Sequence, residues 1–80
     1  MRTTDEKHSA KFDKLLRGKK VDSCRYMTRE EADDMGWYKR PLAIIFTDGT
    51  HIVLQSDDEG NDGGAAFIGG GKEDHVIYTI

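Results

Sequence analysis

The architecture follows from one run of residues, Pro41-Leu42-Ala43-Ile44-Ile45-Phe46-Thr47-Asp48-Gly49-Thr50-His51-Ile52-Val53-Leu54-Gln55. In residues 41–47 apolar side chains fall on both faces of an extended chain, which predicts a strand covered on both sides. Asp48-Gly49 predicts a two-residue type I′ turn, in which both central positions need positive φ. Residues 50–55 alternate again and predict the returning strand. Pro41 lacks a backbone N–H, so it can stand only at the start or the edge of the first strand.

The flanking segments supply further strands and one short helix. Alternation predicts strands at residues 21–27 and 75–80, and residues 65–68 form a short apolar run. Thr28-Arg29-Glu30-Glu31 is a capping box, which predicts a helix ending at Gly36. We therefore expect an α+β fold with a small antiparallel sheet of four or five strands, the last of which pairs inside the sheet. Such a small sheet curls to protect its edges, so an SH3-like barrel is compatible with the pattern.

Residues 5–17 predict an amphipathic helix at the N-terminus, capped by Thr4 and ended by Gly18. Its apolar side carries His8, Phe12, Leu15 and Leu16, and its basic side carries Lys7, Lys11, Lys14 and Arg17. A helix this short is marginal in water, so it either docks or stays a loosely held arm. We divide the chain into this arm, residues 1–18, and a single compact α+β domain, residues 19–80.

Charge is unevenly distributed along the 80 residues, whose net charge is -3. Residues 1–40 hold 11 Lys and Arg against 8 Asp and Glu, whereas residues 41–80 hold 1 against 7. The single cysteine, Cys24, excludes an intramolecular disulfide and fits a reducing compartment, where we expect it as a small buried side chain. No apolar run is long enough for a bilayer, so we expect a soluble protein of the cytoplasm with no membrane partner.

The most unusual segment is Ser56-Asp57-Asp58-Glu59-Gly60-Asn61-Asp62-Gly63-Gly64, which we call the acidic loop. It predicts a solvent-facing loop with a strong negative field. Its spacing does not match an EF-hand, because Gly60 stands where a reading from Asp58 needs Asp or Asn. Three interpretations remain: a divalent-cation site outside the EF-hand pattern, a surface for a partner, or a hydrated turn in which Asn61 and the glycines take positive φ. The candidate partner-binding residues of the loop are Asp57, Asp58, Glu59, Asn61 and Asp62.

Trp37-Tyr38-Lys39-Arg40 is a second candidate contact segment, because Trp, Tyr and Arg are enriched at binding hot spots. We expect Trp37, the only tryptophan, to fill the small core. Tyr38, Lys39 and Arg40 would then form the rim of a contact surface.

No complete catalytic set can be assembled from the sequence. The three histidines lack metal-ligand spacing, and residues 69–72 do not satisfy the phosphate-loop pattern. The carboxylates stand in polar contexts that do not raise a pKa. We therefore expect no enzyme activity, no metal and no cofactor.

Several blocks of the chain resemble a family of short, uncharacterised proteins encoded mostly by tailed bacteriophages, including cyanophages. The blocks are Arg25-Tyr26-Met27-Thr28, Glu30-Glu31-Ala32, Gly36-Trp37-Tyr38-Lys39-Arg40-Pro41-Leu42, Asp48-Gly49 and Ser56-Asp57-Asp58-Glu59-Gly60-Asn61-Asp62-Gly63-Gly64-Ala65. The resemblance covers about half of the chain and leaves out the helix at residues 5–17. It implies a phage origin and a compact α+β domain, and it implies no reaction.

Together these observations predict a non-enzymatic, phage-encoded binding module that contacts a host or phage protein through the acidic loop, in the host cytoplasm. One alternative is a minor virion protein whose loop is stabilised by a divalent cation. A second is nucleic-acid binding through the basic helix, which the acidic C-terminal half disfavours. The oligomeric state and the identity of the partner stay open.

Overall fold

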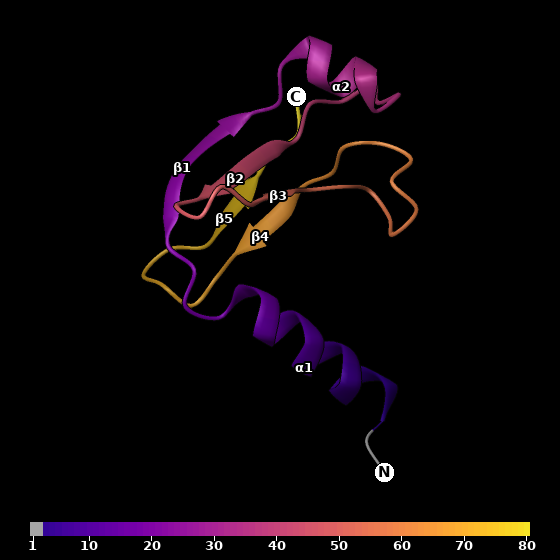
Figure 1. Cartoon of the computed structure of the whole chain (residues 1–80). Coiled ribbons are helices and arrows are strands. Elements are labelled where there is room, and N and C mark those ends of the chain that lie inside the picture. The colour runs from indigo at the N-terminus through magenta and orange to yellow at the C-terminus, as the bar shows by residue number, and fades with distance from the viewer. Residues whose placement is uncertain (1–2) are drawn as a thin grey trace.

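The computed structural model describes residues 3–80, which form a mixed α+β fold of two helices and five strands (Figure 1). The elements are α1 (Thr4–Leu16), β1 (Val21–Tyr26), α2 (Arg29–Asp34), β2 (Leu42–Phe46), β3 (His51–Val53), β4 (Ala66–Ile68) and β5 (His75–Ile77). One antiparallel sheet has the order β1-β2-β3, and β4 pairs with β5 in a second one. The α+β class is thus confirmed, whereas the SH3-like barrel is wrong, because the described strands form two separate sheets and no closed barrel.

The predicted hairpin is confirmed, but its turn is of a different type. Ile45 pairs with His51, the Phe46 N–H donates to the Thr50 carbonyl at 2.9 Å, and the Gly49 N–H donates to the Phe46 carbonyl at 3.1 Å. Only Gly49 has a positive φ, of 90°, so the type I′ turn is wrong. A three-residue loop needs a single left-handed position, which Gly49 supplies without strain.

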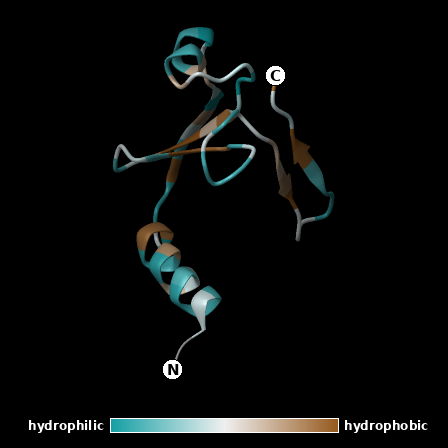
Figure 2. Cartoon of the chain, turned by 90° about the vertical axis from the view of Figure 1, so that its right-hand side faces the viewer, coloured by the Kyte–Doolittle hydropathy of each residue, from teal (hydrophilic) through white to brown (hydrophobic). Residues whose placement is uncertain are grey.

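The C-terminal strand does not join the main sheet, so that expectation is wrong. β5 pairs with β4, because the connection through residues 69–74 is short and favours pairing between neighbours along the chain. Figures 1 and 2 show these two strands as a second layer behind β2 and β3. Ile80 fastens this layer to the main sheet, since it exchanges two backbone hydrogen bonds with Arg40, at 2.6 and 3.1 Å.

The core lies where α2 covers one end of the three-stranded sheet. Its buried members are Met27, Ala32, Trp37 and Ala43, and Val53 packs against them. Trp37 is only 2% exposed, which confirms its predicted place in the core. A core of this size makes each large member important for stability.

Two local signals position Trp37 in the core. The capping box at the start of α2 is confirmed, with the Thr28 hydroxyl accepting from the Glu31 N–H and the Glu31 carboxylate accepting from the Thr28 N–H. At the other end, Gly36 takes a φ of 76°, and the Trp37 N–H donates to the Ala32 carbonyl at 2.8 Å. This Schellman arrangement turns the chain back toward the sheet.

Helix α1 extends away from the rest of the molecule (Figure 1). It is capped by Thr3, one residue before the predicted Thr4, and Gly18 takes the expected left-handed conformation after it. No residue of α1 is buried. The Cα radius of gyration is 14.3 Å, whereas a compact chain of this length has about 12 Å.

The expectation that Cys24 is buried is wrong. Cys24 is exposed because β1 is an edge strand whose residues from Val21 to Arg25 are all exposed. Among residues 3–80 we find no helix with the length and apolar character needed to cross a membrane.

Candidate functional site

The acidic loop and the Trp37-Tyr38-Lys39 segment are joined to each other, although more than 20 residues separate them in the chain. The Trp37 Nε1–H donates to the Gly60 carbonyl at 2.6 Å. The Tyr38 and Lys39 N–H groups donate to Asp62 Oδ1 at 3.1 and 3.0 Å. We call the resulting surface, formed by Tyr38, Lys39 and residues 57–61, the acidic–aromatic surface.

Asp62 is the side chain that fastens the loop. Besides the two N–H groups of the aromatic segment, its Oδ1 accepts from the Gly63 N–H at 2.8 Å. These donors lower the pKa of the Asp62 carboxyl, with the Lys39 N–H contributing most. The carboxylate is half-buried and turned toward the backbone. Asp62 was predicted as a contact residue, but the structure shows it acting within the molecule.

Asp62→Ala should lower the melting temperature by several degrees at neutral pH, because three backbone N–H groups lose their acceptor. The lowered pKa means that ionised Asp62 stabilises the fold above its unfolded pKa, and that this contribution disappears as pH falls through the folded value. The gap between variant and wild type should therefore narrow in acid. Thermal melts by circular dichroism from neutral to acidic pH measure both effects.

Asp58→Ala is the matched control, because Asp58 is exposed and belongs to the same loop. Its melting temperature should equal that of the wild type at every pH. Equal melting temperatures for Asp62→Ala and Asp58→Ala at neutral pH would contradict the fastening role of Asp62.

Asp57 and Asn61 hold the turn of the loop. Asp57 Oδ1 accepts from the Glu59 N–H at 2.9 Å, and Asp57 Oδ2 accepts from the Asn61 side-chain amide at 2.8 Å. The Asn61 amide is the main cause of the lowered pKa of Asp57. Asn61 has no positive φ, so that expectation is wrong; Gly60, with a φ of 72°, is the left-handed residue of this turn.

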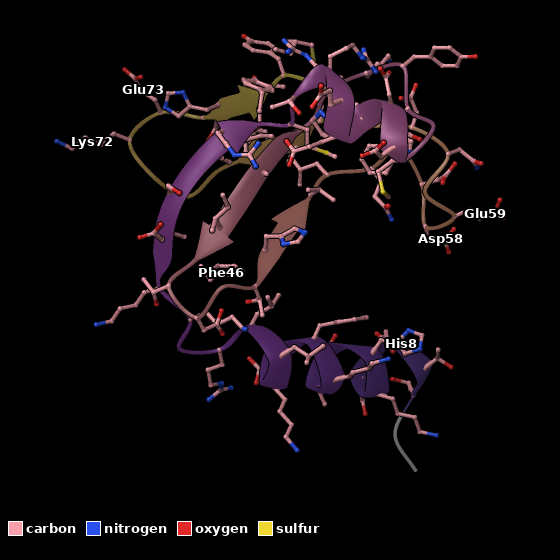
Figure 3. The ribbon with its side chains drawn as sticks, turned by 45° about the horizontal axis from the view of Figure 1, so that its top comes forward. His8, Phe46, Asp58, Glu59, Lys72 and Glu73 are labelled. Atoms are coloured by element: carbon pink, nitrogen blue, oxygen red, sulfur yellow. The ribbon has the colours of Figure 1, made fainter. Side chains whose placement is uncertain are left out.

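Asp58 and Glu59 are the carboxylates that the loop leaves to solvent. Both are exposed, and Figure 3 shows them projecting from the tip of the loop. Neither forms an ion pair with any residue between 3 and 80. The negative charge of the surface is therefore carried by these two side chains and by Asp57, which is also exposed but accepts hydrogen bonds within the turn.

Tyr38 is the prominent aromatic group of the surface, with 87% of the residue exposed. It borders a hollow of about 320 Å³, whose other lining residues are Arg29, Asp33, Gly36 and Trp37. Arg29 already has partners within the molecule, because it pairs with Asp33 at 2.9 Å and donates to the Tyr38 carbonyl at 2.7 Å. The hollow is shallow and open to solvent, and Tyr38 is one of its lining residues.

Lys39 and Arg40 differ in their surroundings. Lys39 is exposed beside Tyr38, whereas Arg40 is half-buried and its backbone pairs with Ile80. The structure places Lys39 on the acidic–aromatic surface and Arg40 behind it, at the junction of the two sheets.

A cation in the acidic loop would need oxygens from several of its side chains. Within residues 3–80 no three His, Cys, Asp or Glu side chains come together in an arrangement that holds a metal ion. Asp57 and Asp62, which have the most fixed oxygens of the loop, already accept from N–H groups. The virion alternative with its stabilising cation stays a prediction.

The structure contains a second concave feature, which we call the sheet groove and which the sequence analysis did not predict. It has a volume of about 280 Å³ and is lined by Arg25, Met27, Glu31, Ala43, Ile45, Gly49, His51 and Val53. The strand register forms this groove. Arg25 lies opposite Ala43, and Ala43 lies opposite Val53, so all three side chains are on one face of the sheet. Alternation alone does not fix this register.

The charged groups of the sheet groove neutralise each other. Arg25 donates to both Glu31 oxygens, at 2.7 and 3.0 Å. With the Thr28 N–H, this pairing lowers the pKa of Glu31 from 4.5 to about 2. A carboxylate held ionised in this way is not a general acid or base near neutral pH.

The comparisons with known proteins leave the phage resemblance untested. No family model matches the sequence, and neither the curated proteins nor the solved structures yielded a match. The phage origin and the activity of the chain therefore stay predictions.

Proposed function

We propose that this protein is a non-enzymatic binding module that contacts a basic protein through the acidic–aromatic surface. The observation that carries this proposal is the double attachment of the acidic loop, through Trp37 to Gly60 and through Asp62 to the Tyr38 and Lys39 N–H groups. It holds the loop that carries two exposed carboxylates against the segment that carries an exposed tyrosine. A fixed presentation of this kind reduces the ordering entropy that a partner has to overcome.

The chemistry of the surface specifies the partner. Asp58 and Glu59 attract Lys and Arg side chains and steer their approach. Tyr38 offers a flat amphipathic ring with few rotatable bonds, and the adjacent hollow gives an aliphatic or cationic side chain a place to insert. The complementary surface is therefore basic and carries at least one protruding side chain.

The sequence resemblance supports a phage-encoded protein that acts in the infected cell, and we propose a host or phage protein as its partner. The resemblance includes both halves of the acidic–aromatic surface, since its blocks contain residues 36–42 and 56–65. This part of the proposal rests on the sequence alone.

A capture experiment with paired variants tests the proposal. Bacterial lysate is passed over the immobilised protein, and retained proteins are quantified by mass spectrometry. Asp58→Asn with Glu59→Gln should lose at least about 90% of a specific partner, which corresponds to the roughly 1.4 kcal/mol of a tenfold loss in affinity. Tyr38→Ala should lose the same protein.

The controls remove equal charge and equal aromatic surface elsewhere. Glu73→Gln with Asp74→Asn changes two carboxylates in another exposed loop, which Figure 3 shows on the opposite side of the molecule at Glu73. Tyr78→Ala removes a tyrosine that is also exposed. Both controls should retain the partner. If every protein that binds the wild type binds all four variants equally, this surface is not the binding site.

A further inference from the structure

The chain exposes more surface than a folded monomer of its mass. Its accessible surface is 6387 Å² for 9.0 kDa, whereas a compact monomer of this mass exposes about 4,900 Å². The excess is about 1,500 Å², and a standard protein interface hides about 800 Å² on each partner. The excess is thus sufficient for two patches per chain, as a reciprocal exchange between two copies requires.

Helix α1 supplies one apolar patch. Phe12, Leu15 and Leu16 are 49%, 55% and 43% exposed, although they occupy one side of the helix. Figure 2 shows this apolar end of α1 lying apart from both sheets. Three lysines, Lys7, Lys11 and Lys14, follow the neighbouring side of the helix, and none forms an ion pair within residues 3–80.

The sheet groove is the complementary surface. Its apolar lining consists of Ile45 and Val53, which are half-buried, and of the core members Met27 and Ala43, which are only 7% and 5% exposed. The adjacent helix α2 carries Glu30 and Asp34, which are exposed and form no ion pair in the described part of the chain. The partly exposed Ile45 and Val53, with free carboxylates beside them, are complementary to an apolar helix side with free lysines beside it.

The lengths of the two surfaces also agree. Helix α1 has 13 residues and is about 20 Å long at 1.5 Å per residue. Strand β2, which runs under the groove, has five residues and spans about 17 Å. One helix can therefore lie along the whole of β2.

The chain directs its own α1 away from its own groove. The Lys19 ammonium bonds to Asp48 Oδ2 at 2.5 Å and to Thr50 Oγ1 at 2.8 Å, and the Thr47 N–H donates to the Lys20 carbonyl at 2.9 Å. These bonds fix the start of β1 against the hairpin turn, so α1 leaves beyond the end of the sheet, past Phe46 (Figure 3).

We infer that α1 of one copy packs into the sheet groove of a second copy, and that the exchange is reciprocal. The result is a closed twofold dimer, in which the lysine row of each α1 faces the acidic α2 of the other copy. This interface uses neither Tyr38 nor the acidic loop, so it is independent of the proposed partner surface.

Sedimentation equilibrium over micromolar to millimolar concentration tests the dimer. The wild type should dimerise, and Leu15→Glu should raise the dissociation constant about thirtyfold, as expected for a central interface residue. Phe67→Glu is the control, since Phe67 is 67% exposed on β4 and carries the same kind of change. It should leave the dissociation constant unchanged. Because both residues are exposed, circular dichroism should show both variants folded.

Charge reversal identifies the two surfaces that meet. Lys11→Glu with Lys14→Glu, and separately Glu30→Lys with Asp34→Lys, should each weaken self-association. An equimolar mixture of the two variants should form a heterodimer, because each acidic surface then faces a basic one. A wild type that stays monomeric at millimolar concentration would overturn the inference. So would a dimer that survives Leu15→Glu, a dimer lost in Phe67→Glu, or a mixture that fails to associate.

Discussion

Trp37→Ala should destabilise the fold by about 3–5 kcal/mol, which approaches the whole stability of a domain this small. Trp37 is 2% exposed and is the largest side chain of a core that otherwise holds Met27, Ala32 and Ala43. The substitution leaves a cavity that so few neighbours cannot refill. It also removes the Nε1–H that bonds to the Gly60 carbonyl, so the acidic loop loses one of its two attachments.

Urea denaturation followed by far-ultraviolet circular dichroism measures the Trp37→Ala effect. Trp37→Phe is the informative comparison, because it keeps most of the apolar volume while it removes the donor to Gly60. It should lose less stability than the alanine variant. A Trp37→Ala protein with a wild-type midpoint would mean that Trp37 does not organise the core.

Gly64→Ala should cost about 2–3 kcal/mol, although it adds a single methyl group. A Cβ at Gly64 would lie 2.6 Å from the carbonyl carbon and oxygen of Gln55 and 2.9 Å from the Ser56 nitrogen. These are backbone atoms, so they cannot turn aside as a flexible side chain would. The loop would have to move, weakening the bond from the Gly64 N–H to the Leu54 carbonyl.

Gly71→Ala is the matched control for Gly64→Ala. A Cβ at Gly71 would meet nothing closer than 3.9 Å, and its backbone is not left-handed. Its urea midpoint should equal that of the wild type or slightly exceed it, because alanine lowers the entropy of the unfolded chain. Equal losses in the two variants would indicate a general effect of glycine replacement rather than a close approach at Gly64.

The features that the sequence predicted correctly are those encoded within a few residues. The capping box at Thr28 and Glu31 is a local exchange of hydrogen bonds, so four residues suffice to recognise it. The same holds for the turn at Gly36 that brings Trp37 into the core. The β2–β3 hairpin was also predictable, because its two strands are neighbours along the chain.

The features that were missed depend on residues far apart in the sequence. The sequence predicts Asp62 as a solvent-facing contact residue, because nothing in its neighbours shows that the Tyr38 and Lys39 N–H groups donate to it. Gly63 and Gly64 were read as positive-φ turn residues. They are buried and have no positive φ, and they are glycine because other backbone comes close.

The separation of the strands into two sheets was missed for the same reason, because it depends on residues far apart in the sequence. Residues 75–80 alternate as a strand should, and alternation says only that a segment is extended, not which strand it joins. The competition between joining the main sheet and pairing with β4 was decided by chain proximity. The backbone pairing of Arg40 with Ile80 joins the two layers, and no local sequence pattern predicts this pairing.

The bond between the Trp37 indole and the Gly60 carbonyl gives the protein an intrinsic reporter. Trp37 is the only tryptophan, so its fluorescence and its single indole N–H resonance arise from this one position. While the loop is attached, that proton should exchange slowly with deuterium. Any ligand that displaces the loop should speed the exchange and shift the emission to the red, so binding can be followed without a label.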